Sequence, residues 1–181
     1  MTATAPVERT LTARDPRLEP WRQFLMAHAR LSRRLDDELR ADHDLSLAEY
    51  DALLTIAEAP GRRIRMRQLA DRVILSKSGV TRLVDRLVID GLVERSACET
   101  DARGAEAVLT QTGLERLRAA SQTHLRGIEH HFLDAIDADD LPVLERALTS
   151  LADRAGPGGE PDRCRSSDRT LDSLGEADTH R

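Results

Sequence analysis

The most constraining feature of this sequence is a pair of short helical patterns separated by only three residues. We expect helices over 66–73 and 77–90, with Ile74-Leu75-Ser76 between them. A junction this short forces the two helices to cross at a large angle. The second pattern has one apolar and one polar face, because its apolar residues recur at i, i+3, i+4 and i+7: Val80, Leu83, Val84 and Leu87.

A further helix is predicted just before this pair. Ser46 and Glu49 have the spacing of a capping box, in which each side chain satisfies a free backbone donor of the other residue. Leu45 and Tyr50 are placed to pack against each other as a hydrophobic staple. Pro60-Gly61 then ends the helix.

A β-hairpin is predicted after the pair. Gly91 ends the second helix as a C-cap, and two short runs, 92–95 and 105–109, predict strands. The polar segment 96–104 between them is too long for a two-residue turn, so we expect a protruding loop. The order helix, helix, turn, helix, hairpin is that of a winged helix-turn-helix.

Amphipathic helices are expected on both sides of this unit. The first contains Trp21 to Leu39, a long one begins after Thr110 and continues to Ile136, and the last has Pro142 in its first turn. Aromatic residues make up only 2% of the chain, so the core must consist of Leu, Val, Ile and Ala, which suits packed helices. The expected fold class is mainly α with a small β-hairpin.

The boundaries follow from these patterns. Residues 1–19 are expected to form a flexible N-terminal arm, 20–155 one helical domain, and 156–181 a disordered tail rich in Gly, Pro, Ser, Asp and Arg. The start of the chain has no apolar signal segment, and no run approaches the ~18 apolar residues of a membrane span. With two cysteines far apart, these features predict a cytoplasmic protein without a membrane partner.

Positive charge is concentrated in one part of an acidic chain. Residues 62–86 contain eight arginines and lysines against two aspartates, a net charge of +6, whereas the whole chain has −5. This pattern favours a localised phosphate-binding face, and the alternative is a run of solvated arginines. The chain contains no nucleophile elbow and no phosphate-binding glycine loop, so we expect that it is not an enzyme.

Several motifs in order resemble the MarR (multiple antibiotic resistance regulator) family, and the resemblance covers about 21–151. They are Gln68-Leu69-Ala70, the run from Ser76 to Leu87, the run from Gly91 to Arg95, a wing with Asp101 and Arg103, and Leu109-Thr110 before the long helix. The wing sequence Asp101-Ala102-Arg103 lacks the second arginine that family members often have.

The resemblance implies a transcription regulator, more often a repressor, that binds near-palindromic double-stranded DNA as a homodimer. It implies winged-helix residues 46–110 between dimerisation helices over 20–45 and 111–155. It also implies that a small-molecule or redox signal changes the spacing of the two recognition helices. The alternative function is a winged helix that serves as a protein-interaction or dimerisation module without specific DNA binding.

The candidate DNA contacts lie in the second helix of the pair and in the wing. Lys77 is the only lysine in the chain and stands at the start of that helix. Arg103 at a hairpin tip suits a narrow minor groove, and Asp101 is expected to hold the wing by a salt bridge or turn. Alternatively, these side chains are solvated, Ser76 is only an N-cap, or Arg82 pairs with an acidic neighbour. The full set of predicted contacts is Ser76, Lys77, Ser78, Thr81, Arg82, Arg86 and Arg103.

An effector pocket is a weaker hypothesis. We expect it between the dimerisation helices and the winged unit, with a small aromatic or phenolic effector, and the alternative is plain core packing. No metal or cofactor is expected, because the spacing of the histidines does not suit a zinc site on one helix. Cys98 could be oxidised, but without a nearby resolving cysteine it is more often incidental. The proposed pocket residues are Trp21, Phe24, His28, Tyr50 and Asp51.

Overall fold

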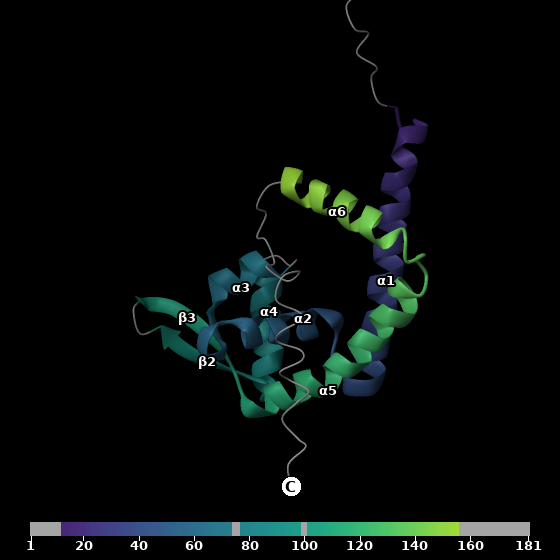
Figure 1. The fold of residues 1–181 in the computed structure, drawn as a ribbon. Coiled ribbons are helices and arrows are strands. Elements are labelled where there is room, and N and C mark those ends of the chain that lie inside the picture. Colours follow the sequence, from purple (N-terminus) through teal and green to yellow (C-terminus); the bar gives the residue numbers. More distant parts are fainter. Residues whose placement is uncertain (1–11, 74–76, 99–100, 156–181) are drawn as a thin grey trace, which may run out of the picture.

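A computed structural model describes residues 12–73, 77–98 and 101–155 (Figure 1). This part of the chain is mainly α-helical with a small antiparallel sheet, as predicted. A short 3-10 helix, Pro16–Leu18, precedes the first long helix, and its N-cap is Asp15. The helices are α1 (Glu19–His43), α2 (Leu47–Glu58), α3 (Met66–Arg72), α4 (Lys77–Ile89), α5 (Gln111–Ile128) and α6 (Leu141–Ala155). Most of the predicted arm and the whole predicted tail lie outside the described residues.

The connection from α1 to α2 is a tight corner. Asp44 ends α1 in the left-handed conformation, with φ 51°, and its N–H donates to the carbonyls of Arg40 and Leu39. The predicted capping box of α2 is confirmed, because Ser46 Oγ accepts from Glu49 N and the Glu49 carboxylate accepts from Ser46 N. Leu45 is buried at this corner, so the start of α2 is anchored in the core.

The winged unit is built around α4. Its apolar residues Val80, Leu83, Val84 and Leu87 are all at most 2% exposed, which confirms the predicted buried face. Gly91 follows with φ 70°, a conformation that favours glycine, and ends the helix as predicted. In Figure 1, α2, α3 and α4 lie together on one side of α5 and next to the sheet.

The sheet differs from the prediction in two ways. Strand β2 (Val93–Cys98) and strand β3 (Asp101–Leu109) extend through most of the segment predicted as a polar loop, 96–104, so that prediction was wrong. A third strand, β1 (Arg63–Arg65), was not predicted and pairs antiparallel with β3, giving the order β1-β3-β2.

Helix α5 begins where the sheet meets the end of α4. Thr110 caps the helix as predicted, with its hydroxyl accepting from Gly113 N, and also donates to the Gly91 carbonyl at 2.7 Å. Gly113 lies so close to the Leu92 carbonyl that an added Cβ would be 2.0 Å from its oxygen. The start of α5 is therefore attached tightly to the turn that follows α4.

The long helix predicted to Ile136 is interrupted. A π-helical turn over Glu129–Leu133 follows α5, and its His131 ring nitrogen lies 2.6 Å from a carboxylate oxygen of Glu38 on α1. α5 packs along α1, whereas α6 leaves this pair and has no buried residue (Figure 1). Within the described ranges, no helix combines the length and apolarity needed to cross a membrane.

Candidate nucleic-acid interface

The polar face of α4 is exposed, as predicted. Ser78, Thr81, Arg82 and Arg86 all lie on this face, opposite the buried apolar residues of the same helix. The Arg82 Nε donates to the Ser78 carbonyl one turn earlier at 3.4 Å, which leaves the side chain along the helix surface. The face thus presents hydroxyl and guanidinium groups, which are the donors that proteins use toward phosphates and base edges.

Of four further predicted site residues, three are located by their backbone alone and one lies outside the described residues. Lys77 is the first residue of α4, but its side chain lies outside the described residues, as does the whole of Ser76. The backbones of Asp101 and Arg103 belong to the first half of β3, and Asp101 is paired with Cys98 in the strand register. Their side chains are likewise outside the described part, so their roles stay predictions.

Arg86 has a partner that sequence reasoning missed. Its Nε donates to Glu49 Oε1 at 2.9 Å, which joins α4 to the first turn of α2. The Glu49 side chain is only 12% exposed, whereas that of Arg86 is 57% exposed. Glu49 was predicted only as a capping residue, and no local pattern connects it to an arginine 37 residues away.

The negative charge on the exposed face of α4 is also compensated. Asp85 forms an ion pair with Arg95 of β2, in which Arg95 Nη2 lies 2.8 Å from Asp85 Oδ1. A carboxylate next to Arg82 and Arg86 would otherwise oppose the approach of a polyanion. The pair therefore preserves the basic character of this face and fixes the start of the hairpin beside α4.

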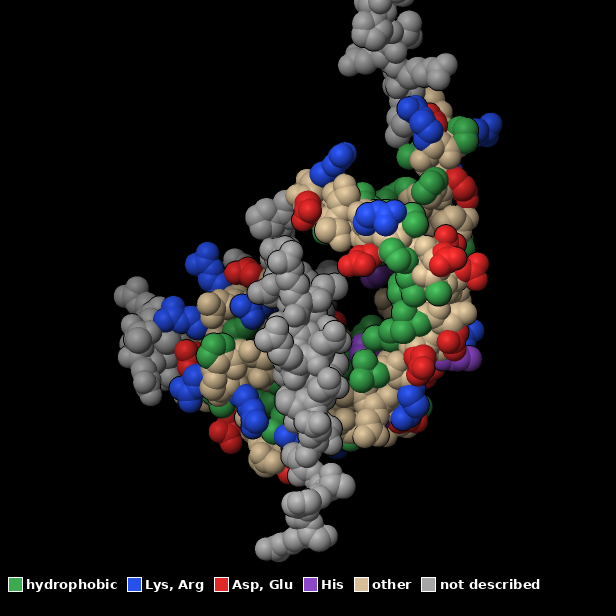
Figure 2. Space-filling model, viewed as in Figure 1, with side chains coloured by type: hydrophobic (Ala, Val, Ile, Leu, Met, Phe, Trp, Pro, Cys, Tyr) green, Lys and Arg blue, Asp and Glu red, His purple; other side chains and the backbone are tan. Residues whose placement is uncertain are grey.

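Strand β1 adds two more exposed arginines to the winged unit. Arg63 and Arg65 are exposed on either side of Ile64, which is only 5% exposed. Arg63 lies 3.8 Å from the Glu106 carboxylate on β3. Figure 2 shows Lys and Arg side chains gathered over the region of α3 and the sheet, and hydrophobic side chains over α1, α5 and α6.

The residues predicted for an effector pocket fall into two groups. Trp21, Phe24 and His28 form a row on α1, with ring centroids 6.1 and 6.4 Å apart, and Trp21 is 55% exposed. Tyr50 is instead buried in the core, with its ring 4.5 Å from that of His124 on α5. The expected apolar cluster of Trp21, Phe24 and Tyr50 is therefore not formed in the protomer, because Tyr50 packs against α5.

The half-buried Asp51 follows Tyr50 on α2. Burial raises the pKa of the Tyr50 hydroxyl and lowers the pKa of the His124 ring, so both groups are neutral at pH 7. The Tyr50 hydroxyl donates to Ser121 Oγ at 3.4 Å, whereas the buried His124 Nδ1 has no hydrogen-bond partner in the described part of the chain. These contacts join α2 to α5 as core packing.

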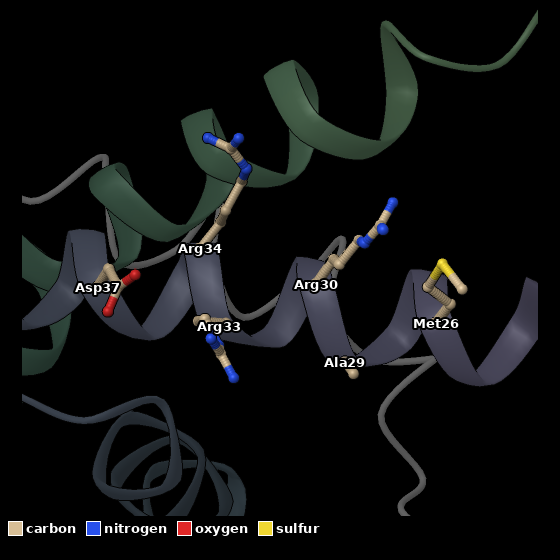
Figure 3. Close-up of a pocket in the computed structure, with 6 residues that line it drawn as sticks. All are labelled: Met26, Ala29, Arg30, Arg33, Arg34 and Asp37. Atoms are coloured by element: carbon tan, nitrogen blue, oxygen red, sulfur yellow. The ribbon is translucent and has the colours of Figure 1, made fainter.

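A separate open groove of about 720 Å³ runs along α1. Its lining residues all come from this one helix. Figure 3 shows Arg30 and Arg34 extending to one side of α1 and Arg33 to the other. A groove bounded by one helix is a surface depression with no opposite wall. The lining consists of Met26, Ala29, Arg30, Arg33, Arg34 and Asp37.

Comparisons with known proteins match this architecture. A model of the MarR family matches residues 43–104, which include α2, α3, α4 and β2. Uncharacterized HTH-type transcriptional regulators of Bacillus are similar: one from Bacillus cereus is 25% identical over 120 residues, or 66% of this chain and 78% of the relative.

Solved structures extend the similarity to both ends of the domain. AbsC, a MarR family transcriptional regulator from Streptomyces coelicolor, is 34% identical, with 81% of this chain and 97% of that chain covered at a TM-score of 0.73. Sco3205, a MarR family regulator from the same organism in complex with DNA, is 30% identical, with 82% and 95% covered and a TM-score of 0.73. A mutant MarR from E. coli complexed with operator DNA is 26% identical over 75% of this chain and 95% of that chain, with a TM-score of 0.67.

These relatives are transcriptional regulators, and those with solved structures share the fold of this chain. The identity to AbsC extends over nearly all of that protein. The chain belongs to the MarR family of transcriptional regulators.

Proposed function

We propose that this protein is a homodimeric repressor that binds a near-palindromic DNA duplex through α4 and the wing. The observation that carries the proposal is the exposed face of α4, where hydroxyl and guanidinium groups lie opposite a fully buried apolar face. Similar proteins solved with DNA support it. In this reading α4 enters the major groove and the wing contacts the adjacent minor groove.

The contacts we propose on α4 differ in kind. Ser78 and Thr81 bind phosphates through their hydroxyls, Lys77 and Arg82 reach base edges or phosphates, and Arg103 of the wing enters the minor groove. Arg86 lies on the same face but is already engaged by Glu49, so we assign it a contact secondary to that of Arg82. Ser76 caps the helix or binds a phosphate.

Dimerisation is inferred from apolar side chains that the protomer leaves exposed outside the winged unit. They lie on α1, at the end of α5 and the turn after it, and on α6, which has no buried residue of its own. A second copy that packs against these helices buries them and gives the open groove on α1 an opposite wall. The exposed set is Trp21, Phe24, Leu25, Met26, Leu125, Leu133, Val143 and Leu151.

The experiment that tests DNA binding starts from a selection with the full-length protein on random duplexes. We expect an enriched near-palindromic sequence, and we expect Lys77→Ala and Arg82→Ala to weaken its binding by about tenfold each, the size of one base contact. Arg146→Ala removes the same charge from exposed α6 and serves as the matched control. Fluorescence anisotropy at several salt concentrations measures the affinities.

Two results would contradict this proposal. If no sequence is enriched over random duplex, the winged helix serves as a protein-interaction or dimerisation module instead. If Lys77→Ala, Arg82→Ala and Arg146→Ala all bind the selected duplex like the unmodified protein, α4 does not present its polar face to DNA.

We further propose that a small aromatic acid releases the DNA by binding at α1. The exposed row of Trp21, Phe24 and His28 offers ring contacts, and the His28 ring offers a nitrogen that hydrogen-bonds a carboxylate. Benzoate should change Trp21 fluorescence over the same concentration range in which it releases DNA. His28→Ala should shift both curves, and Tyr50→Phe should shift neither, since Tyr50 is buried. Release without a change at Trp21 would place the effector elsewhere.

A further inference from the structure

The first turn of α2 is held from two sides by side chains of other helices. On one side, Asp36 of α1 accepts a hydrogen bond from Leu47 N at 2.8 Å through one carboxylate oxygen and pairs with Arg40 through the other at 2.7 Å. On the other side, Glu49 pairs with Arg86 of α4. The same helical turn therefore connects α1 with α4.

The two carboxylate oxygens of Glu49 bind different partners. Oε2 accepts from Ser46 N at 2.9 Å and from Ser46 Oγ at 2.7 Å, which completes the capping box. Oε1 accepts from Arg86 Nε at 2.9 Å. A capping box requires only the first of these interactions, so the second one is a separate feature of this chain.

The surroundings of Glu49 fix the geometry of its bond to Arg86. Burial raises the pKa of Glu49, but the hydrogen bonds from Ser46 and the ion pair with Arg86 outweigh it and hold the pKa below its usual range. Glu49 is therefore ionised at pH 7, with a carboxylate fixed by Ser46. Because this buried carboxylate is held by hydrogen bonds, Arg86 can pair with it in only one geometry. An exposed ion pair, in contrast, can adopt many geometries.

Arg86 transfers this constraint to the face of α4 that we assign to DNA. It lies one turn after Arg82 on that face, and the helix between them also holds Asp85 in its pair with Arg95. A rotation of α4 about its axis would move Arg86 away from Glu49 and would turn Arg82 relative to the groove at the same time. The Glu49 to Arg86 bond thus resists the motion that changes which base edges α4 meets.

We propose that Glu49 is a positioning residue for sequence-specific recognition: it holds α4 through Arg86 in the orientation that gives the selected DNA sequence its advantage over other sequences. Glu49 itself contacts no DNA. This inference rests on the proposed function, because it concerns the specificity of the same face.

Two substitutions separate the capping role of Glu49 from its pairing with Arg86. Glu49→Gln keeps a residue that serves in capping boxes but removes the charge that holds Arg86. Ser46→Ala removes the capping hydroxyl but keeps the Ser46 backbone N–H, which still holds Glu49 Oε2 at 2.9 Å and leaves the bond to Arg86 in place, so it is the matched control. For each full-length variant, anisotropy gives the affinity for the selected duplex and for a scrambled duplex, and thermal unfolding gives the melting temperature.

The ratio of the two affinities is the decisive quantity, since loss of a phosphate contact weakens both duplexes alike. We expect Glu49→Gln to lower this ratio about three- to tenfold, the range for a charged hydrogen bond with one exposed partner. Ser46→Ala should lower the melting temperature and leave the ratio unchanged. Arg86→Gln should lower the ratio at least as much, since it breaks the same bond and also removes the secondary contact of Arg86. Adding Glu49→Gln to Arg86→Gln should cause little further loss, because the bond is already broken.

The outcomes distinguish this role from the proposed function. Three results would overturn the positioning role: an unchanged ratio in Glu49→Gln, an equal loss of ratio in Ser46→Ala, or fully multiplicative losses in the double variant. The proposed DNA-binding face of α4 would still stand if Arg82→Ala weakens binding. If Glu49→Gln does not fold, an unchanged ratio in Arg86→Gln overturns the positioning role, since that change breaks the bond and leaves the capping box intact. If the selection enriches no sequence, both inferences fall.

Discussion

Replacing Gly113 by alanine tests how tightly α5 is joined to the winged unit. In an open helix, Gly→Ala stabilises by about 1 kcal/mol, since alanine has the higher helix propensity. At Gly113 the added Cβ would lie 2.0 Å from the Leu92 carbonyl oxygen, and real Cβ contacts are essentially never under 3.0 Å, so the start of α5 must move by about 1 Å. We therefore expect the opposite sign.

The magnitude follows from what this movement disrupts. Thr110 N donates to the Leu92 carbonyl at 3.1 Å, and the Thr110 hydroxyl donates to the Gly91 carbonyl at 2.7 Å. Losing these two bonds costs about 1 kcal/mol each, and the crowding costs about 1 to 3 kcal/mol. After subtraction of the gain in helix propensity, Gly113→Ala should lower the free energy of unfolding by about 2 to 4 kcal/mol.

Gly127 on the same helix provides the matched control. A Cβ there would meet Glu38 Oε2 at 2.6 Å and Leu35 Cδ2 at 2.7 Å, which are ends of flexible side chains on α1. They can rotate away, so Gly127→Ala should change the free energy of unfolding by no more than about 1 kcal/mol. The assay is urea unfolding followed by circular dichroism at one protein concentration. A Gly113→Ala protein as stable as the original, or less affected than Gly127→Ala, would refute the close junction.

Two further predictions concern α5. Because burial lowers the pKa of His124 below its ordinary value of 6.5, the unfolded chain binds a proton on this residue at a higher pH than the native chain does, and the native state should lose stability as the pH falls below 6.5. His124→Leu should reduce this loss in urea unfolding measured between about pH 7 and pH 5, and an identical pH dependence would contradict it. Leu125→Asp should yield unfolded or aggregated protein by light scattering, because the proposed dimer buries this residue, whereas the same change at exposed Ala119 should be tolerated. A well-folded Leu125→Asp monomer would contradict the dimer.

The parts of the fold that local rules determine could be predicted from the sequence. The capping box of Ser46 and Glu49, the Thr110 cap and the left-handed Gly91 each depend on residues within a few positions, and all three are found in the structure. The two faces of α4 follow from helical periodicity alone and are likewise confirmed. These features were enough to predict the order of the helices and the hairpin, and the face of α4 assigned to DNA.

The errors concern features that depend on distant partners or on short segments. Strand β1 has only three residues, too few for a periodic pattern, and forms because β3 offers it an edge. The bond between Glu49 and Arg86 and the packing of Tyr50 on His124 join residues far apart in sequence. The separation of Tyr50 from Trp21 follows from this packing, since a side chain directed toward α5 cannot also face the exposed row on α1.

Strand β1 has a consequence for the entropy of binding. Its pairing with Val108, Ala107 and Glu106 of β3 and the burial of Ile64 already order the backbone that carries Arg63 and Arg65. Ordering a backbone residue costs about 1 to 2 kcal/mol, so arginines on a loose loop would lose this amount again whenever they met a polyanion. Here that loss occurs once, during folding, and a contact made by Arg63 or Arg65 restricts only the rotamers of its own side chain.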